Sequence, residues 1–200
     1  MENKTILEIF NSIIPLNSKE IELIFQKAKV ESFTKKTTLL KLNHTCNHMY
    51  FVISGCLRLY YLKDDVERNC FFFHENNFCT AFGSFMQQRP SNQILQTIED
   101  TTCLTISHAD LEILYTLVPK MNTLVRKILE ERYTNAHDII SSFILHNPEE
   151  RYLEFINKYP LLVNRIPEYH ISSYIGITPK SFSRLKGRIK KRFSVLQAKK

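Results

Sequence analysis

Residues 168–187 read EYHISSYIGITPKSFSRLKG, a stretch with the features of two short helices joined by a tight turn. Ile171 and Ile175 lie one helical turn apart and form the buried face of the first predicted helix. Gly176 follows at the turn, where a left-handed backbone conformation favours glycine. Thr178 is a good N-cap, and the proline after it fits the first position of a second helix. The stretch therefore predicts a helix-turn-helix, with an ordinary helical hairpin as the alternative.

The second predicted helix separates apolar from polar side chains. Phe182, Leu185 and Ile189 share one face. In a helix-turn-helix the second helix enters the major groove, so the side chains on its outer face are the predicted contacts with double-stranded DNA. These predicted DNA-binding residues are Thr178, Lys180, Ser181, Ser183, Arg184, Arg188 and Lys191.

The distribution of charge supports the same interpretation. The chain has a net charge of +7, from 27 basic and 20 acidic residues. Residues 147–200 hold 12 Lys or Arg and 4 Asp or Glu, a net charge of +8, so the rest of the chain carries −1. A basic segment of this kind suits phosphate contacts and counterion release. The alternative is a solvated basic tail, which Lys199 and Lys200 fit best.

Composition limits the class of protein. A chain of 200 residues, 44% of them apolar, can form one large domain or two small ones, and the charge asymmetry favours two. No apolar run is long enough to cross a membrane, and the opening MENKTILEIF lacks the pattern of an export signal. The five cysteines, at 46, 56, 70, 79 and 103, show no paired spacing. These features predict a cytoplasmic protein with free thiols and no membrane partner.

The spacing of apolar residues divides the chain into helical and extended regions. Residues 3–29 predict two helices, with Asn17 and Glu20 as a capping box at the start of the second. From about 30 to 107 the period is two, and short strands rich in Val, Ile, Tyr and Phe predict an antiparallel β-barrel or jelly roll. The expected strands are His48–Ser54, Leu57–Leu62, Val66–Phe73, Ile94–Ile98 and Cys103–Ile106.

A long helix is predicted over residues 119–146, because two adjacent stripes recur at three- and four-residue spacing. Two stripes indicate a helix buried on two sides, one against its own sheets and one against a partner helix, with packing inside a single chain as the alternative. The first stripe is the predicted homodimer interface and comprises Met121, Val125, Ile128, Arg132, Asn135 and Ile139. The second comprises Leu124, Leu129, Tyr133, Ala136, Ile140 and Phe143.

The predicted fold is α+β in three parts. Residues 1–118 form a β-barrel (jelly-roll) sensor domain with flanking helices, and residues 119–146 form the dimerisation helix. Residues 147–200 form a winged-helix-like helix-turn-helix domain, which opens with a capping box at Asn147 and Glu150. The segment KKRFSVLQAKK after Ile189 is too short for a two-stranded wing, so Phe193–Leu196 are expected to form one strand or a helix end.

Three segments carry a resemblance to a known family: YFVISGCLRLYY at 50–61, NPEERYLEFI at 147–156 and IPEYHISSYIGITPKSFSRLK at 166–186. In this order they resemble the Crp/Fnr family of bacterial transcription regulators, above all its short members common in Bacteroidetes. The resemblance implies a sensor domain of the cyclic-nucleotide-binding type, a homodimer, and partners in double-stranded DNA and RNA polymerase. It also matches Lys180, Ser181 and Arg184 to the base-reading residues, with Arg184 on guanine.

The expected effector pocket departs from the family pattern. Members that bind cyclic AMP carry a Gly-Glu-Leu segment followed closely by Arg-Ser or Arg-Thr. Residues 78–93 read FCTAFGSFMQQRPSNQ, without a Gly-Glu pair and with a proline after Arg89. An unidentified small molecule other than cyclic AMP is therefore the expected effector. Its expected contacts are Phe71, Phe73, Phe82, Gly83, Ser84, Arg89 and Ser91.

No cofactor, bound metal or enzymatic activity is predicted. His44, Cys46 and His48 alternate along a strand, but the outer two lie too far apart for one ion, and no carboxylate completes a metal site. No CxxC motif indicates an iron–sulfur cluster, and Cys79 is expected to be a small buried hydrophobe. Two alternatives to a transcription regulator remain: a non-catalytic ligand- or protein-binding module, and a metal-dependent cupin-like enzyme.

Overall fold

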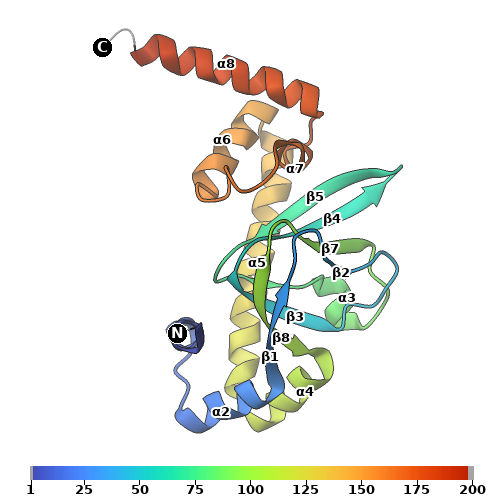
Figure 1. Cartoon of the computed structure of the whole chain (residues 1–200), viewed down its shortest axis with the longest axis vertical. Coiled ribbons are helices and arrows are strands. Elements are labelled where there is room, and N and C mark those ends of the chain that lie inside the picture. The colour runs from blue at the N-terminus through green and yellow to red at the C-terminus, as the bar shows by residue number, and fades with distance from the viewer. Residues whose placement is uncertain (1, 198–200) are drawn as a thin grey trace.

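The helix α5 (Lys120–Leu145) forms the spine of the molecule in the computed structural model (Figure 1). It runs alongside the β-sheets, with α2 and α4 at one end and α6, α7 and α8 at the other (Figure 1). The structure describes the backbone of residues 2–197 and the side chains of residues 8–192. The other helices are α1 (Glu2–Ile13), α2 (Ser18–Lys27), α3 (Phe82–Gln87), α4 (His108–Leu117), α6 (Pro148–Lys158), α7 (Glu168–Tyr174) and α8 (Pro179–Gln197).

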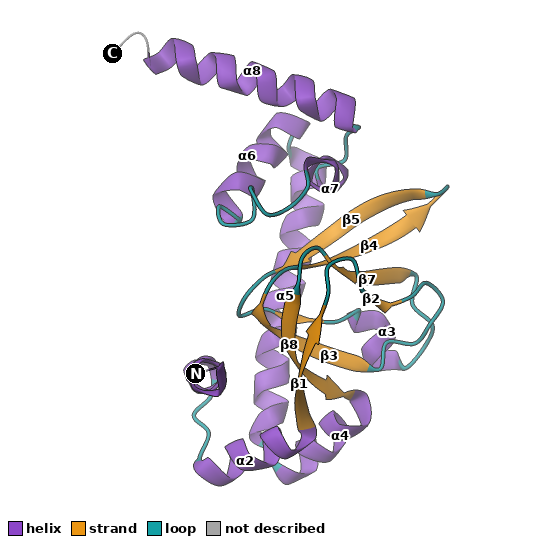
Figure 2. Cartoon of the chain, viewed as in Figure 1, coloured by secondary structure: helices purple, strands orange, loops and turns teal. Residues whose placement is uncertain are grey.

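Eight strands form two four-stranded antiparallel sheets, drawn in orange in Figure 2. One sheet has the order β1-β8-β3-β6 and the other β2-β7-β4-β5. The expected closed barrel is wrong: the strands pair in two separate sheets, with β1 and β6 at the edges of one and β2 and β5 at the edges of the other. The strands are β1 (Ala28–Phe33), β2 (Thr38–Leu40), β3 (His48–Ser54), β4 (Leu57–Lys63), β5 (Val66–Phe73), β6 (Phe78–Cys79), β7 (Gln93–Thr97) and β8 (Thr101–Ser107).

The turn between β3 and β4 requires glycine. Gly55 has a φ of 99°, a left-handed conformation, and a Cβ at this position would lie 2.5 Å from Oγ1 of Thr101. The strands on either side of it were predicted to within one residue.

Both predicted capping boxes are confirmed. The side chain of Asn17 accepts the N–H of Glu20 (2.9 Å), and the Glu20 carboxylate accepts the N–H of Asn17 (2.8 Å). Asn147 and Glu150 repeat this arrangement at the start of α6. Because each cap satisfies backbone N–H groups that the first turn leaves unpaired, the N-cap residues Asn17 and Asn147 fix where α2 and α6 begin.

Two clusters of buried apolar side chains organise the packing. The first joins both sheets to α1, α2, α4 and the first half of α5. The second joins α6, α7 and α8, and it includes Cys56, Phe72 and Ile98 from the sheets. The C-terminal helices, α6–α8, are therefore docked onto the sheets. Among the described residues, no helix is both long and apolar enough to cross a bilayer.

The segment after Ile189 takes the second of its two expected forms, a helix end. α8 continues through Gln197, so the segment 193–196 is helical and not a strand. Within residues 2–197, no strand follows β8.

Candidate nucleic-acid interface

A tight turn over residues 175–178 joins α7 to α8 at the predicted position. Gly176 has a φ of 80°, and the N–H of Ile177 donates to the carbonyl of Ser172 (3.0 Å). Ser172 is buried, and its small side chain permits the close approach of the two helices. Oγ1 of Thr178 accepts the N–H of Ser181 (3.2 Å), so this threonine caps α8 as predicted.

The inner face of α8 is fixed to α6 and α7. Phe182 and Leu185 are buried, and the Phe182 ring meets Tyr152 of α6 edge-on, with 5.0 Å between centroids. Ile171 and Ile175 of α7 complete this cluster. The outer face of α8 consequently points away from the protein, at the end of the molecule opposite to α2 and α4 (Figure 1).

The seven side chains predicted to bind DNA are all exposed. Three of the four basic ones, Lys180, Arg184 and Arg188, recur at four-residue spacing and so share one stripe of α8. Within the part of the chain that the structure describes, no acidic group lies at ion-pair distance from these three. Their charges are therefore available to a ligand.

Two other basic residues of α8 are already paired. Lys186 forms an ion pair with Glu168 of α7, and Arg192 forms one with Glu149 of α6 (2.7 Å). The ion pair of Arg192 ties the second half of α8 to α6. Lys180, Arg184 and Arg188 therefore remain as a basic stripe that begins at the N-terminus of α8.

Arg151 of α6 holds the turn against the end of α5. Its Nε donates to the carbonyl of Ile175 (2.9 Å) and a second N–H donates to the carbonyl of His146 (2.6 Å). Its guanidinium also lies over the ring of Phe143, 4.6 Å from the centroid. A Cβ at Gly176 would lie 2.8 Å from the same ring, so α5 packs directly against the turn.

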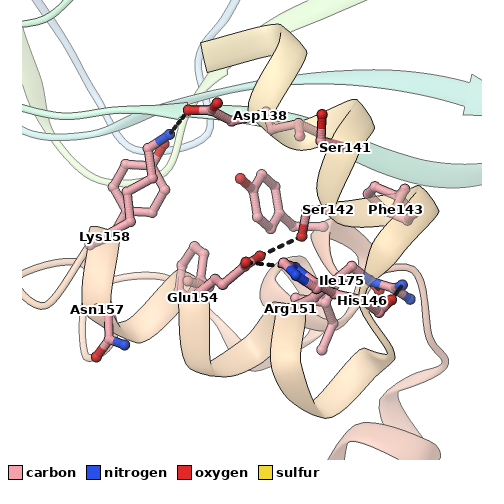
Figure 3. A pocket seen from close by; sticks show the side chains of 14 residues that line it. Asp138, Ser141, Ser142, Phe143, His146, Arg151, Glu154, Asn157, Lys158 and Ile175 are labelled. Carbon is pink, nitrogen blue, oxygen red and sulfur yellow. Dashed lines mark hydrogen bonds and ion pairs between the residues drawn. The ribbon is translucent and has the colours of Figure 1, made fainter. Parts of the chain in front are cut away.

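A groove of about 590 Å³ lies between the last turns of α5 and α6, beside this arginine (Figure 3). Across it Glu154 pairs with His146 (2.6 Å) and accepts a hydrogen bond from Ser142. At its far side Lys158 pairs with Asp138 (3.8 Å). These polar contacts join the spine helix to the helices that carry the basic stripe.

A buried polar network also fixes α7 to the sheets. Arg58 of β4 is 3% exposed; its guanidinium donates to Glu67 (2.9 Å) and contacts Nδ1 of His170 (3.0 Å). Hydrogen bonds from Arg58 hold the pKa of Glu67 below its usual range. Burial, and then the charge of Arg58, lower the pKa of His170 to about 4, so its imidazole is neutral at pH 7. Ser173 adds a bond to the Glu67 carbonyl (2.7 Å) and one from the N–H of Asn69 (3.0 Å).

Arg165, in the segment between α6 and α7, makes a second link to the sheets. It donates to Glu75 (2.8 Å) and to Glu99 (3.1 Å). Burial on its own raises the pKa of Glu75, but hydrogen bonds from Arg165 and from backbone amides lower it to about 2. The sequence predicted neither link, because the partners lie up to 112 residues apart and no local pattern connects them.

The six side chains predicted to form the dimer interface face the chain's own domains. Met121, Val125 and Ile128 are buried in the first core. Arg132 lies on two rings of β5, and Asn135 accepts a hydrogen bond from Lys158. Ile139 lines the groove of Figure 3.

The apolar side chains of α5 that remain exposed belong largely to the other stripe: Tyr133, Ile140 and Phe143. Ile144 and Leu145 are exposed beside them. In the single chain the first stripe thus packs against the chain's own domains along its length, whereas the second packs against the first core only at Leu124 and Leu129 and is exposed at Tyr133, Ile140 and Phe143.

Most of the predicted effector residues are either buried and already bonded or exposed. Phe73 is buried, and its ring contacts Phe71 at 6.1 Å. The hydroxyl of Ser84 in α3 is already engaged, accepting from the N–H of Cys46 (2.9 Å). Ser91 is buried and bonds its own loop at Gln93. None of the seven residues lines the groove of Figure 3, and Gly83 and Arg89 are exposed.

Of the candidate metal and redox residues, His44 and His48 are exposed, whereas Cys46 and Cys79 are buried. Within the described part of the chain, no group of three or more His, Cys, Asp or Glu could hold a metal ion. All five cysteines are free thiols, and Cys79 is buried as expected. Burial raises the pKa of Cys56 and of Cys103 to about 12, so these thiols stay protonated and unreactive near neutral pH.

Comparisons with known proteins agree with this architecture. Residues 30–116 match the family model described as a cyclic nucleotide-binding domain. An anaerobic regulatory protein of Haemophilus influenzae is 24% identical over 192 residues, covering 88% of this chain and 73% of that protein.

Solved structures share the fold across both parts of the chain. FixK2 from Bradyrhizobium japonicum superposes with a TM-score of 0.73 at 16% identity, over 82% of this chain and 85% of that one. A protein described as a transcriptional regulator of the Crp/Fnr family from Eubacterium rectale superposes with a TM-score of 0.70 at 14% identity, over 88% and 85%. The resemblance to the Crp/Fnr family is thus confirmed: residues 30–116 match the cyclic nucleotide-binding domain model, and the chain has the fold of regulators of this family.

Proposed function

We propose that this chain is a sequence-specific DNA-binding transcription regulator, with α7 and α8 as its helix-turn-helix and RNA polymerase as a further partner. The observation that carries the proposal is the exposed stripe of Lys180, Arg184 and Arg188, which no acidic group among the described residues neutralises. This stripe starts at the N-terminus of α8, and in a helix-turn-helix the N-terminal end of the second helix is the end that contacts the bases in the major groove. The inner face of α8 is packed against α6 and α7, which holds the stripe in place. The regulatory relatives and the fold support the same role, and they give no support to an enzyme.

Arg184 is the proposed base reader. It is exposed one turn beyond Lys180, and an arginine there makes two parallel hydrogen bonds to guanine O6 and N7. Lys191 lies two turns further along α8, where the helix leaves the groove, and it is proposed to meet a phosphate.

The protein is proposed to act as a homodimer through the second half of α5. Tyr133, His137, Ile140 and Ile144 follow spacings of four, three and four residues, which is the repeat of a coiled-coil interface. Tyr133, Ile140 and Ile144 are strongly exposed in the single chain. Two helices α8 related by this twofold axis read a near-palindrome with half-sites about one helical turn of DNA apart.

Cyclic AMP is not the proposed effector. The Gly-Glu pair of members that bind it is absent, and Arg89, which stands nearest to the expected arginine, is exposed before a proline. Isothermal titration calorimetry with cyclic AMP and cyclic GMP is expected to show no binding. Micromolar affinity for either nucleotide would overturn this part of the proposal.

Selection from a random duplex library, followed by titration of the selected operator and of random DNA, tests the DNA-binding role. Arg184→Ala should cost about 1–3 kcal/mol of preference for the operator. Lys191→Ala should weaken binding to both duplexes and reduce the salt slope by about one. Lys186→Ala is the matched control, since Lys186 is paired with Glu168 at the edge of the packed face. The assignment fails if Arg184→Ala keeps the full preference.

A further inference from the structure

Arg132, at the junction of the sheets, α5 and α6, is a cation that contacts aromatic rings but no carboxylate or other hydrogen-bond acceptor among the described residues. Its guanidinium carbon lies 4.4 Å from the ring centroids of both Phe71 and Phe73. It makes no hydrogen bond or ion pair with any residue that the structure describes. Arg58 and Arg165, the other arginines packed against the sheets, each bind carboxylates.

The two aromatic faces do not replace an acceptor. They attract the positive charge, but a guanidinium carries five N–H donors in its own plane, and ring faces accept from none of them, which leaves them to solvent or to a ligand. Burial lowers the pKa of Arg132, although its side chain is only partly buried. A guanidinium nevertheless stays protonated in proteins, so the site keeps a charge that needs acceptor oxygens.

A cavity of about 260 Å³ adjoins this arginine. Its polar lining is predominantly basic or amide in character: Arg132, Lys127, Lys158, Asn76 and Asn77, with Glu131 as the one carboxylate among its described lining residues. Lys127 and Lys158 already donate to the Ile13 carbonyl (2.7 Å) and to Asn135 (2.8 Å). Arg132 is therefore the cation of this cavity with its donors free.

We infer that this cavity binds a small organic anion whose carboxylate or phosphate group accepts hydrogen bonds from Arg132. Planar, bidentate recognition of such groups is what an arginine does best. The cavity is smaller than the 300–1,000 Å³ typical of sites for drug-sized ligands, so the ligand is a small metabolite and not a nucleotide. None of the residues 82–91 lines it, and of the expected effector contacts only Phe71 and Phe73 lie against Arg132.

The site joins three parts of the molecule. Asn76 and Asn77 belong to the loop between β5 and β6, and Arg132 belongs to α5. Lys158 is the last residue of α6. An anion bound there links the cyclic nucleotide-binding domain to the helices that carry the basic stripe. An effect of the bound anion on DNA affinity rests on the proposed function, whereas the binding of the anion itself does not depend on that proposal.

Calorimetric titration of the full chain, without DNA and at constant ionic strength, tests the site. The probes are inorganic phosphate, succinate and 3-phosphoglycerate, with sodium chloride as the reference. At least one probe should bind saturably, and Arg132→Met should weaken that binding at least about tenfold. Arg126→Met is the matched control, an exposed arginine of the same helix paired with Glu130, and it should bind as the wild type does.

Two further variants keep the test decisive. Lys158→Met changes an exposed lining residue, so it should fold normally and still weaken binding severalfold. Arg184→Ala should leave the affinity unchanged, which excludes the basic stripe as the anion site. The inference is overturned if no probe binds saturably, or if Arg132→Met and Lys158→Met both bind as the wild type. Since no DNA is present, either result leaves the DNA-binding proposal to its own test.

Discussion

Replacing Gly176 by alanine should destabilise the C-terminal helices and misplace α8. A non-glycine residue in the left-handed conformation that Gly176 adopts, with φ of 80°, costs about 1–2 kcal/mol. The added Cβ also lies 2.8 Å from Phe143, but that ring is half-exposed and can turn aside, so the contact adds little. The backbone term therefore dominates, and the expected loss of unfolding free energy is about 1–2 kcal/mol.

Gly187→Ala is the control with the opposite sign. Gly187 lies inside α8, and a Cβ there meets no atom within 4 Å. Alanine is favoured over glycine in a helix by about 0.5–1 kcal/mol, so this variant should be the more stable one. Urea unfolding followed by circular dichroism measures both changes, and each 1 kcal/mol corresponds to about 2–4 °C in Tm for a chain of this size. If Gly176→Ala is as stable as the wild type, the turn does not depend on the left-handed conformation, and the reasoning fails.

Two further predictions concern the dimer and pH. Ile144→Glu places a charge on a side chain that is 75% exposed in the single chain, so it should yield folded monomers. Ile128→Glu, at a position 4% exposed, should unfold the protein because it buries an unpaired charge. Light scattering measures the oligomeric state and circular dichroism the folding of each variant, and a dimeric Ile144→Glu would place the interface elsewhere. In the folded state His170 stays neutral down to about pH 4, whereas in the unfolded chain its imidazole binds a proton below about pH 6.5. The free energy of unfolding should therefore decrease by on the order of 2–3 kcal/mol as the pH is lowered from about 6.5 to about 4. His170→Gln should flatten that slope in urea titrations at successive pH values, and an unchanged slope would show that another group titrates.

Features set by neighbouring residues could be predicted from the sequence. The capping boxes at Asn17 and Asn147 and the turn at Gly176 involve contacts within a few residues, so the pattern of residue types carries the necessary information. The strands β3 and β5 were predicted exactly for the same reason. The helix α3 was missed, because six residues are too few to show a helical period.

The two stripes of α5 show where this information ends. Spacing predicts that both stripes are buried, but the register of the helix against the sheets decides which one faces the chain's own core. That register is fixed by contacts such as Ile128 in the first core and Arg132 on Phe71 and Phe73, which are distant in sequence. The anion site could not be predicted for the same reason. Nothing in the sequence around Arg132 indicates that the distant rings of Phe71 and Phe73 pack against it.

On α8, the number of basic residues in the sequence differs from the number left without an ion pair after folding, and this difference affects DNA affinity. The sequence counts seven basic residues between 179 and 192 as one footprint. Folding brings Glu168 and Glu149 against Lys186 and Arg192, and DNA must break those ion pairs before it gains either charge. Because each phosphate neutralised by a free cation adds about 0.9 to the salt slope, the two paired residues should contribute less than Arg184 or Arg188. The measured slope should therefore fall below the value expected from the basic count, and Glu149→Gln, which frees Arg192, should raise it.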